Sequence, residues 1–216
     1  MKFGKPVIAM VLGAAVLAGC RSSGDIVADQ GVGITSFLTA CPAIGIPDYT
    51  GDVTTFKAVG SRDASQIDVT AAMTNVTTTC DESGSQIYAT AEFDVLARRT
   101  DTRGARQVEL PYFVTILRGG RAVISKRVGT VTLNFANGQE RAQARGTGAA
   151  YVDRAEATLP ADIREQITRR RKAGDADAAV DPLSRPEVKA AIDRASFEML
   201  LGFQLTPDQL AYNATR

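Results

Sequence analysis

SQIYATAEFDVLARRT, residues 85–100, is the stretch that decides the fold class. In its middle, apolar residues occupy every second position and polar residues occupy the positions between them. This period of two is typical of a strand with one buried face, because successive side chains of a strand point to opposite faces of the sheet. The predicted buried face consists of Ile87, Ala89, Ala91, Phe93 and Val95.

Comparable stretches lie on both sides of this strand. Residues 67–73 alternate in the same way, and residues 197–205 predict a closing strand. RGGR at 118–121 and Asn137-Gly138 are hairpin-turn signals between further strands. Six or seven short strands at this spacing favour a mainly β fold, an antiparallel immunoglobulin-like β-sandwich.

A charged, alanine-rich insertion at about residues 161–193 interrupts the β pattern before the last strand. It predicts one helix over 161–172 and a second short helix over 186–193. Thr206 and Pro207 have the residue types of an N-cap and a first helical position, so a short C-terminal helix is expected. We expect a single domain over residues 34–216.

Residues 1–19 have the features of a secretory signal peptide. Lys2 and Lys5 are followed by an apolar run that ends in small residues and is short for a membrane span. An N-terminal transmembrane anchor that is never cleaved is the alternative interpretation.

The end of that run, Leu17-Ala18-Gly19-Cys20, resembles the lipobox of exported bacterial lipoproteins. The resemblance implies cleavage between Gly19 and Cys20, a diacylglycerol on the Cys20 thiol and an acyl chain on the new amino terminus. No other cofactor is expected. An ordinary cleavage site next to a chance cysteine is the alternative. Two or more acyl chains hold a protein stably on a bilayer without spanning it.

The resemblance also predicts a location. The mature protein would face the periplasm on a lipid anchor, and Arg21 after the cysteine, where an aspartate would favour the inner membrane, favours the outer membrane of a Gram-negative bacterium. Residues 20–33 are small and polar, so we expect a lipidated N-terminus followed by a flexible tether.

Cys41 and Cys80 are the two cysteines that remain. In an exported protein such a pair is normally a disulfide, which stabilises the fold by closing a long loop. A metal site and a redox pair are the alternatives. No metal is expected, because two thiolates without histidine make a poor zinc site.

Composition narrows the function classes. The chain has 25 Lys and Arg against 24 Asp and Glu and no histidine, and loss of Lys2 and Lys5 with the signal peptide leaves 23 against 24. Balanced charge argues against a nucleic-acid partner. The absence of histidine removes the commonest general base. No catalytic motif is present, and an enzyme would need a carboxylate pair such as Glu92 with Asp94.

The densest charge cluster predicts a contact with anionic groups of lipid headgroups, lipopolysaccharide or peptidoglycan. It consists of Arg169, Arg170, Arg171 and Lys172. The other interpretation is a solvated helix end, where cations offset the helix dipole. Acidic residues over 175–181 follow closely, but they lack the glycine and terminal glutamate of a calcium loop.

The apolar C-terminal segment LLGFQLTPDQLAYN, residues 200–213, has two interpretations. In the first, the segment is a sheet edge to which a partner adds a strand. In the second, it is the last strand followed by a helix that covers a sheet edge. Taken together, the sequence predicts a non-enzymatic, lipid-anchored scaffold or accessory subunit of a periplasmic or outer-membrane assembly, with an envelope protein as partner. A module that binds glycan or a cell-wall fragment is the alternative.

Overall fold

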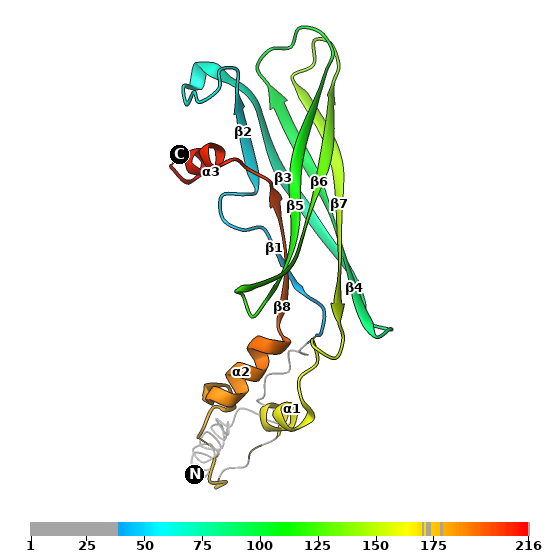
Figure 1. Ribbon diagram of the computed structural model, residues 1–216, viewed down its shortest axis with the longest axis vertical. Coiled ribbons are helices and arrows are strands. Elements are labelled where there is room, and N and C mark those ends of the chain that lie inside the picture. Colours follow the sequence, from blue (N-terminus) through cyan, green and yellow to red (C-terminus); the bar gives the residue numbers. More distant parts are fainter. Residues whose placement is uncertain (1–38, 170, 172–173, 178, 216) are drawn as a thin grey trace, which may run out of the picture.

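A computed structural model describes residues 39–169, 171, 174–177 and 179–215 of the chain. Within these ranges, eight strands form two four-stranded sheets with a few short helices beside them, which confirms the predicted mainly β fold (Figure 1). The strands are β1 (Ala43–Gly45), β2 (Asp52–Phe56), β3 (Ile67–Asp81), β4 (Gln86–Arg99), β5 (Arg106–Arg118), β6 (Ala122–Phe135), β7 (Arg141–Asp153) and β8 (Phe197–Phe203). Because β3 to β7 span 13 to 15 residues each, the prediction of short strands is wrong.

The strand order is β1-β8-β5-β6 in one sheet and β2-β3-β4-β7 in the other. The chain passes from one sheet to the other between β1 and β2, between β4 and β5, between β6 and β7 and between β7 and β8. All paired strands are antiparallel except β1 and β8, which are parallel. The antiparallel prediction is therefore wrong for this pair. These two strands come from opposite ends of the described chain, so no hairpin imposes an antiparallel direction on them.

The core lies between the two sheets, and β4 is central to it. The predicted apolar face of β4, from Ile87 to Val95, is confirmed, since none of its five side chains is more than 1% exposed. Side chains from the facing sheet pack into the same cluster, among them Leu110, Leu133, Met199 and Leu201. Burial of this apolar area is the main stabilising contribution to the fold.

Aromatic rings fill the middle of this space. Tyr112 on β5 and Phe93 on β4 meet edge to face, with ring centroids 5.0 Å apart. The Tyr112 hydroxyl donates a hydrogen bond of 2.7 Å to the carbonyl of Thr147 on β7. Gly129 lies beneath this tyrosine, and a Cβ there would be 2.6 Å from its Cζ atom. Tyr112 thus joins the two sheets through β4 and β7, and its ring lies over Gly129 on the neighbouring strand β6 of its own sheet, where a side chain would collide with it.

The hairpin predicted at Gly119-Gly120 is confirmed, since β5 and β6 pair with each other. Asn137-Gly138 lies between β6 and β7, which belong to different sheets and do not pair, so the hairpin predicted there is wrong. Gly119 and Gly120 connect β5 to β6 with φ angles of 57° and 68°, and Gly138 follows β6 with a φ of 79°. These left-handed conformations favour glycine.

Arg99, at the end of β4, is 1% exposed. Its Nε donates to the carbonyl of Gln139, and its Nη2 lies 2.8–2.9 Å from the carbonyls of Thr102, Gly104 and Ala136. Its Nη1 has no hydrogen-bond partner among the described residues. The side chain therefore ties the β4–β5 connection to the β6–β7 connection at the end of the sheets farthest from the helices α1 and α2 (Figure 1).

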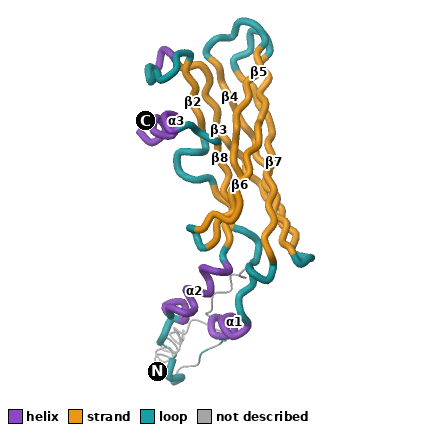
Figure 2. The backbone as a smooth tube through the Cα atoms, viewed as in Figure 1, coloured by secondary structure: helices purple, strands orange, loops and turns teal. Residues whose placement is uncertain are grey.

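Two helices, α1 (Ala161–Thr168) and α2 (Pro186–Ala195), lie beyond the other end of the sheets (Figure 2). A short 3₁₀ turn, Pro182–Ser184, precedes α2, and another, Ala64–Gln66, precedes β3. The helices have their own apolar cluster: Leu159, Ile163, Ile167, Val188 and Ala191. The predicted helix over 161–172 is too long, because the backbone is extended at Arg169. Arg171 instead donates through its side chain to the carbonyl of Gln166 in the last helical turn.

The C-terminal helix α3 (Pro207–Thr215) is confirmed together with its cap. The Thr206 N–H donates to Gln209 Oε1 at 2.9 Å, and the Gln209 N–H donates to Thr206 Oγ1 at 3.3 Å, which is a capping box. Asn213 then donates to the carbonyls of Tyr49 and Asp52 beside β2, at 2.8 Å each.

This arrangement favours one of the two interpretations of residues 200–213. β1 pairs with β8 at Glu198–Leu200, the Phe203 N–H donates to the carbonyl of Thr50, and α3 packs against the edge strand β2. The segment therefore fits a strand and helix that cover an edge better than an edge to which a partner adds a strand.

Candidate functional site

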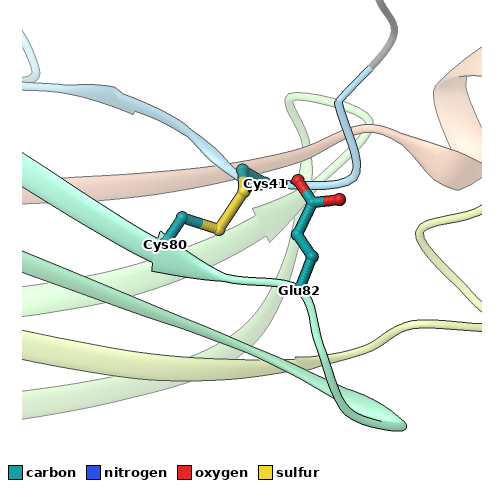
Figure 3. Close-up of side chains that lie close together, drawn as sticks. All are labelled: Cys41, Cys80 and Glu82. Carbon is teal, nitrogen blue, oxygen red and sulfur yellow. Dashed lines mark hydrogen bonds between the residues drawn. A yellow bond between two sulfur atoms is a disulfide. The ribbon is translucent and has the colours of Figure 1, made fainter.

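Cys41 and Cys80 form a disulfide, as predicted, with Cα atoms 6.2 Å apart (Figure 3). The bond joins the segment before β1, in one sheet, to the end of β3, in the other. It lies at the end of the sheets that faces α1 and α2 (Figure 1).

Glu82 lies beside this disulfide, a feature that the sequence analysis missed (Figure 3). Its Oε1 accepts a hydrogen bond of 2.7 Å from the Thr39 hydroxyl and lies 2.7 Å from Cys41 Sγ. A disulfide sulfur has no proton to donate, so the second contact is a close approach of oxygen to sulfur. The Cys41 N–H donates to Thr39 Oγ1 at 3.1 Å, which holds this part of the chain in place.

Cys41, Cys80 and Glu82 are also a group whose ligand atoms lie within 4.8 Å of one another. Metals bind the thiolate form of cysteine, and the two sulfurs are bonded to each other here. The group fits a structural cross-link better than the metal site or redox pair that the sequence left open.

Cys20, the predicted lipidation residue, and Gly19, on the other side of the predicted cleavage point, lie outside the described residues. The same holds for the predicted signal peptide 1–19 and tether 20–33. Within the described ranges, no helix is long and apolar enough to cross a membrane.

The predicted basic cluster is only partly described, since Arg170 and Lys172 lie outside the described residues. Arg169 is paired with Asp177, and Arg171 lies 3.4 Å from the same carboxylate. Burial raises the pKa of Asp177, but the hydrogen bonds and charges of the arginines outweigh it and lower the pKa overall. Two of the four cations therefore share one carboxylate within the fold, so part of their charge is offset internally and the interpretation as a binding patch for anionic groups is weakened.

Two of the acidic residues over 175–181 make contacts within the fold. Asp177 is occupied by the arginines, and Asp181 Oδ1 accepts the Leu183 N–H at 2.9 Å, as the N-cap of a 3₁₀ turn.

The carboxylates that an enzyme would need, Glu92 and Asp94, lie on the outer face of β4. Asp94 accepts hydrogen bonds from Asn75 at 2.9 Å and from Arg145 at 3.3 Å, which lower its pKa. Asn75 has a φ of 52° in an irregular part of β3, so Asp94 supports the backbone there.

A surface that the sequence analysis missed is the first half of β6, Ala122–Val128, named here the β6 edge segment. All seven residues are exposed, and Val123, Ile124 and Val128 are 62%, 51% and 59% exposed. The second half of the same strand buries Val131, Leu133 and Phe135. The sequence carried a signal of this change, since Lys126 and Arg127 interrupt the alternation of apolar residues.

A groove of about 680 Å³ lies on the sheet β2-β3-β4-β7. No residue of the other sheet lines it, so it opens on the outer face of its own sheet. Its exposed lining includes the apolar Leu96 and the polar Arg98, Arg141 and Gln143.

No protein-family model matches this chain, and no curated protein and no solved structure shows significant similarity to it.

Proposed function

We propose that this chain is a lipid-anchored lipoprotein of the bacterial envelope that serves as a non-enzymatic scaffold or accessory subunit of a periplasmic or outer-membrane assembly. The observation that carries the proposal is Leu17-Ala18-Gly19-Cys20 directly behind a cationic start and an apolar run. Diacylglycerol and an N-terminal acyl chain on Cys20 are the attached groups, and the near-balance of charge disfavours nucleic acid as a partner.

The disulfide supports this location. Structural disulfides form and persist in oxidising compartments such as the periplasm. Cys41 and Cys80 are bonded, and together they join the two sheets close to the start of the described chain.

The start of the described chain indicates where a tether would join the domain. The described chain starts at the end of the sheets near α1 and α2, and the β4–β5 and β6–β7 connections lie at the far end (Figure 1). A tether from a lipid on Cys20 would therefore join the domain at the helical end.

The fold is suited to a scaffold. We propose that the two sheets form an immunoglobulin-like β-sandwich, supported by their shared core and by the four places where the described chain passes between them. A rigid body of this kind presents strand edges and loops to partners without a catalytic centre.

Site-specific photo-crosslinking in intact cells tests the scaffold function. A photoreactive residue is placed at exposed positions distributed over the surface, such as Val59, Leu96 and Val123, in the full lipidated chain. The proposal predicts one reproducible envelope protein in the cross-linked product, identified by mass spectrometry. Free monomer from every position would contradict it.

The alternative function, a module that binds a glycan or cell-wall fragment, is supported by the groove on the outer face of β2-β3-β4-β7. The side chains of Arg141 and Gln143 can hydrogen-bond hydroxyl groups, and Leu96 offers an apolar contact. Retention of the full chain on peptidoglycan, with loss of retention in Arg141→Ala/Gln143→Ala and unchanged retention in Arg127→Ala, would favour this function over the first.

A further inference from the structure

We propose that the β6 edge segment, Ala122–Val128, is a docking edge that takes an extended acidic strand of a partner protein. This inference rests on the proposed scaffold function and names the class of partner that the scaffold would hold.

The backbone of the segment is available on one side. β6 is the last strand of its sheet, and it pairs with β5 along Ala122–Phe135. No strand among the described residues pairs with its other side. An edge strand presents a row of backbone N–H and C=O groups, and these pair readily with an added strand.

The side chains of the segment supply apolar contact area. Val123, Ile124 and Val128 are more than half exposed, although the β-branched valine and isoleucine suit a buried strand face. Contact with a partner strand would remove this apolar surface from water.

The charge of the segment selects the occupant. Lys126 and Arg127 are exposed, and the sequence contains no acidic residue between Gly119 and Phe135. The Arg127 side chain has no hydrogen bond or ion pair with any other described residue, and the Lys126 ammonium lies 5.2 Å from the centre of the Phe113 ring. Opposite charges on paired strands are favourable, so an acidic strand fits this edge.

The same charges disfavour a second copy of this chain as the partner that pairs with this edge. Antiparallel pairing of two β6 edge segments would place cations of the two copies directly opposite or diagonal to each other. Like charges in these positions are destabilising. Lysine and arginine on an edge strand thereby suppress self-association while leaving the edge open to a strand of opposite charge.

The edge is held in position before any partner binds. The Gly119 N–H donates to the carbonyl of Ser196 at 2.9 Å, and Arg118 Nε donates to the carbonyl of Arg194 at 2.7 Å. Arg121 lies 3.5 Å from Asp193. These contacts fix the β5–β6 turn against the end of α2 and the start of β8, so little ordering cost is expected on binding.

The first test uses the full lipidated chain in detergent micelles and a nine-residue peptide of alternating glutamate and valine. The peptide should bind, and amide hydrogen exchange should slow at residues 122–128. A lysine–valine peptide of the same length should not bind. A glutamate–valine peptide that is N-methylated along one edge should bind at least about tenfold more weakly, because it cannot complete the backbone ladder.

Charge reversal provides the matched variants. Lys126→Glu/Arg127→Glu should lower affinity for the glutamate peptide by about tenfold or more and should create affinity for the lysine peptide. Arg141→Glu reverses the charge of an exposed residue on the other sheet and should not change the affinity for either peptide. Equal binding of both peptides, full binding of the N-methylated peptide or exchange protection elsewhere would overturn the inference.

The second test distinguishes this inference from the proposed function. Photo-crosslinkers at Val123 and Ile124 should capture an acidic segment of the envelope partner, while one at Val59 should not. Capture of a partner from Val59 or Leu96 alone would overturn the docking edge and keep the scaffold. Capture of a second copy, or of residues 20–38 of the same chain, would overturn the docking edge as well. Absence of any partner from every position would overturn both proposals.

Discussion

The Phe93 ring fills the space in front of Gly146, its register partner across β4 and β7, so that a Cβ on the glycine would collide with the Cζ and Cε2 atoms of the ring. The same Cβ would lie 2.9 Å from Cγ2 of Val131 on β6. The packing of Phe93 in the core therefore depends on the absence of a side chain at position 146.

Gly146→Ala should lower the free energy of unfolding by about 2 kcal/mol, because the core must shift to admit a methyl group. Urea denaturation followed by circular dichroism measures the change. Gly84→Ala is the control, since its nearest neighbour would be the carbonyl oxygen of Gln86 at 3.5 Å, and a change within about 0.5 kcal/mol is expected. Equal stability of the two variants would contradict the packing described here.

Arg99→Met should lower the free energy of unfolding by about 3 kcal/mol, because four backbone carbonyls lose their donor in a buried site. Arg98→Met is a neighbouring control. Arg98 is an exposed partner of Glu140, so its replacement should cost less than about 1 kcal/mol. Hydrogen exchange should also accelerate in the two connections that Arg99 joins, and unchanged exchange there would refute its role.

Cys41→Ser/Cys80→Ser should lower the free energy of unfolding by about 4 kcal/mol, the chain-entropy value for a closed loop of this length. Addition of a reductant should lower the stability of the natural protein toward that of the variant. It should leave the variant itself unchanged. A natural protein whose denaturation midpoint does not respond to complete reduction would show that the disulfide contributes nothing.

Stability should fall in acid partly through Asp68. Arg106 Nη1 and Nη2 lie 2.7 and 2.6 Å from its two carboxylate oxygens, and this hydrogen bonding, opposed by burial, lowers the pKa of Asp68. A carboxyl group with a lowered pKa in the folded state stabilises it above the pKa of the unfolded chain, about 4, and loses this contribution as the pH falls further.

The measurement is urea denaturation between pH 2 and pH 7 for the natural protein and Asp68→Asn. The difference in free energy of unfolding between them should be largest above about pH 5 and should shrink as the pH falls below about 4. A difference that is constant with pH would mean that Asp68 does not titrate with a lowered pKa.

Local patterns predicted those parts of the fold that depend on local chemistry. The alternation in residues 87–95 identified a buried strand face, and the residue types at Gly119-Gly120 and Thr206-Pro207 identified a turn and a helix start. The parallel pairing of β1 with β8 could not be predicted, because residues more than 150 positions apart determine it through packing.

For the candidate surfaces too, the sequence predicted residue types, whereas the contacts between them depend on the folded chain. The pairing of Cys41 with Cys80 followed from the number of cysteines, but the approach of Glu82 to that bond depends on where the end of β3 lies. The exposure of Ala122–Val128 depends on the position of β6 at the edge of its sheet. Arg169 and Arg171 stood out as charges in the sequence, whereas their shared contact with Asp177 required the folded chain.

The most direct measurement of the central claim, the lipid anchor, is the mass of the amino-terminal peptide of the protein isolated from membranes. We expect that peptide to begin at Cys20 and to carry a diacylglyceryl group and an acyl chain. Cys20→Ala should remain unprocessed and should not incorporate a labelled fatty acid. An unmodified Cys20 in the natural protein, or residues 1–19 still attached to the mature chain, would contradict the account.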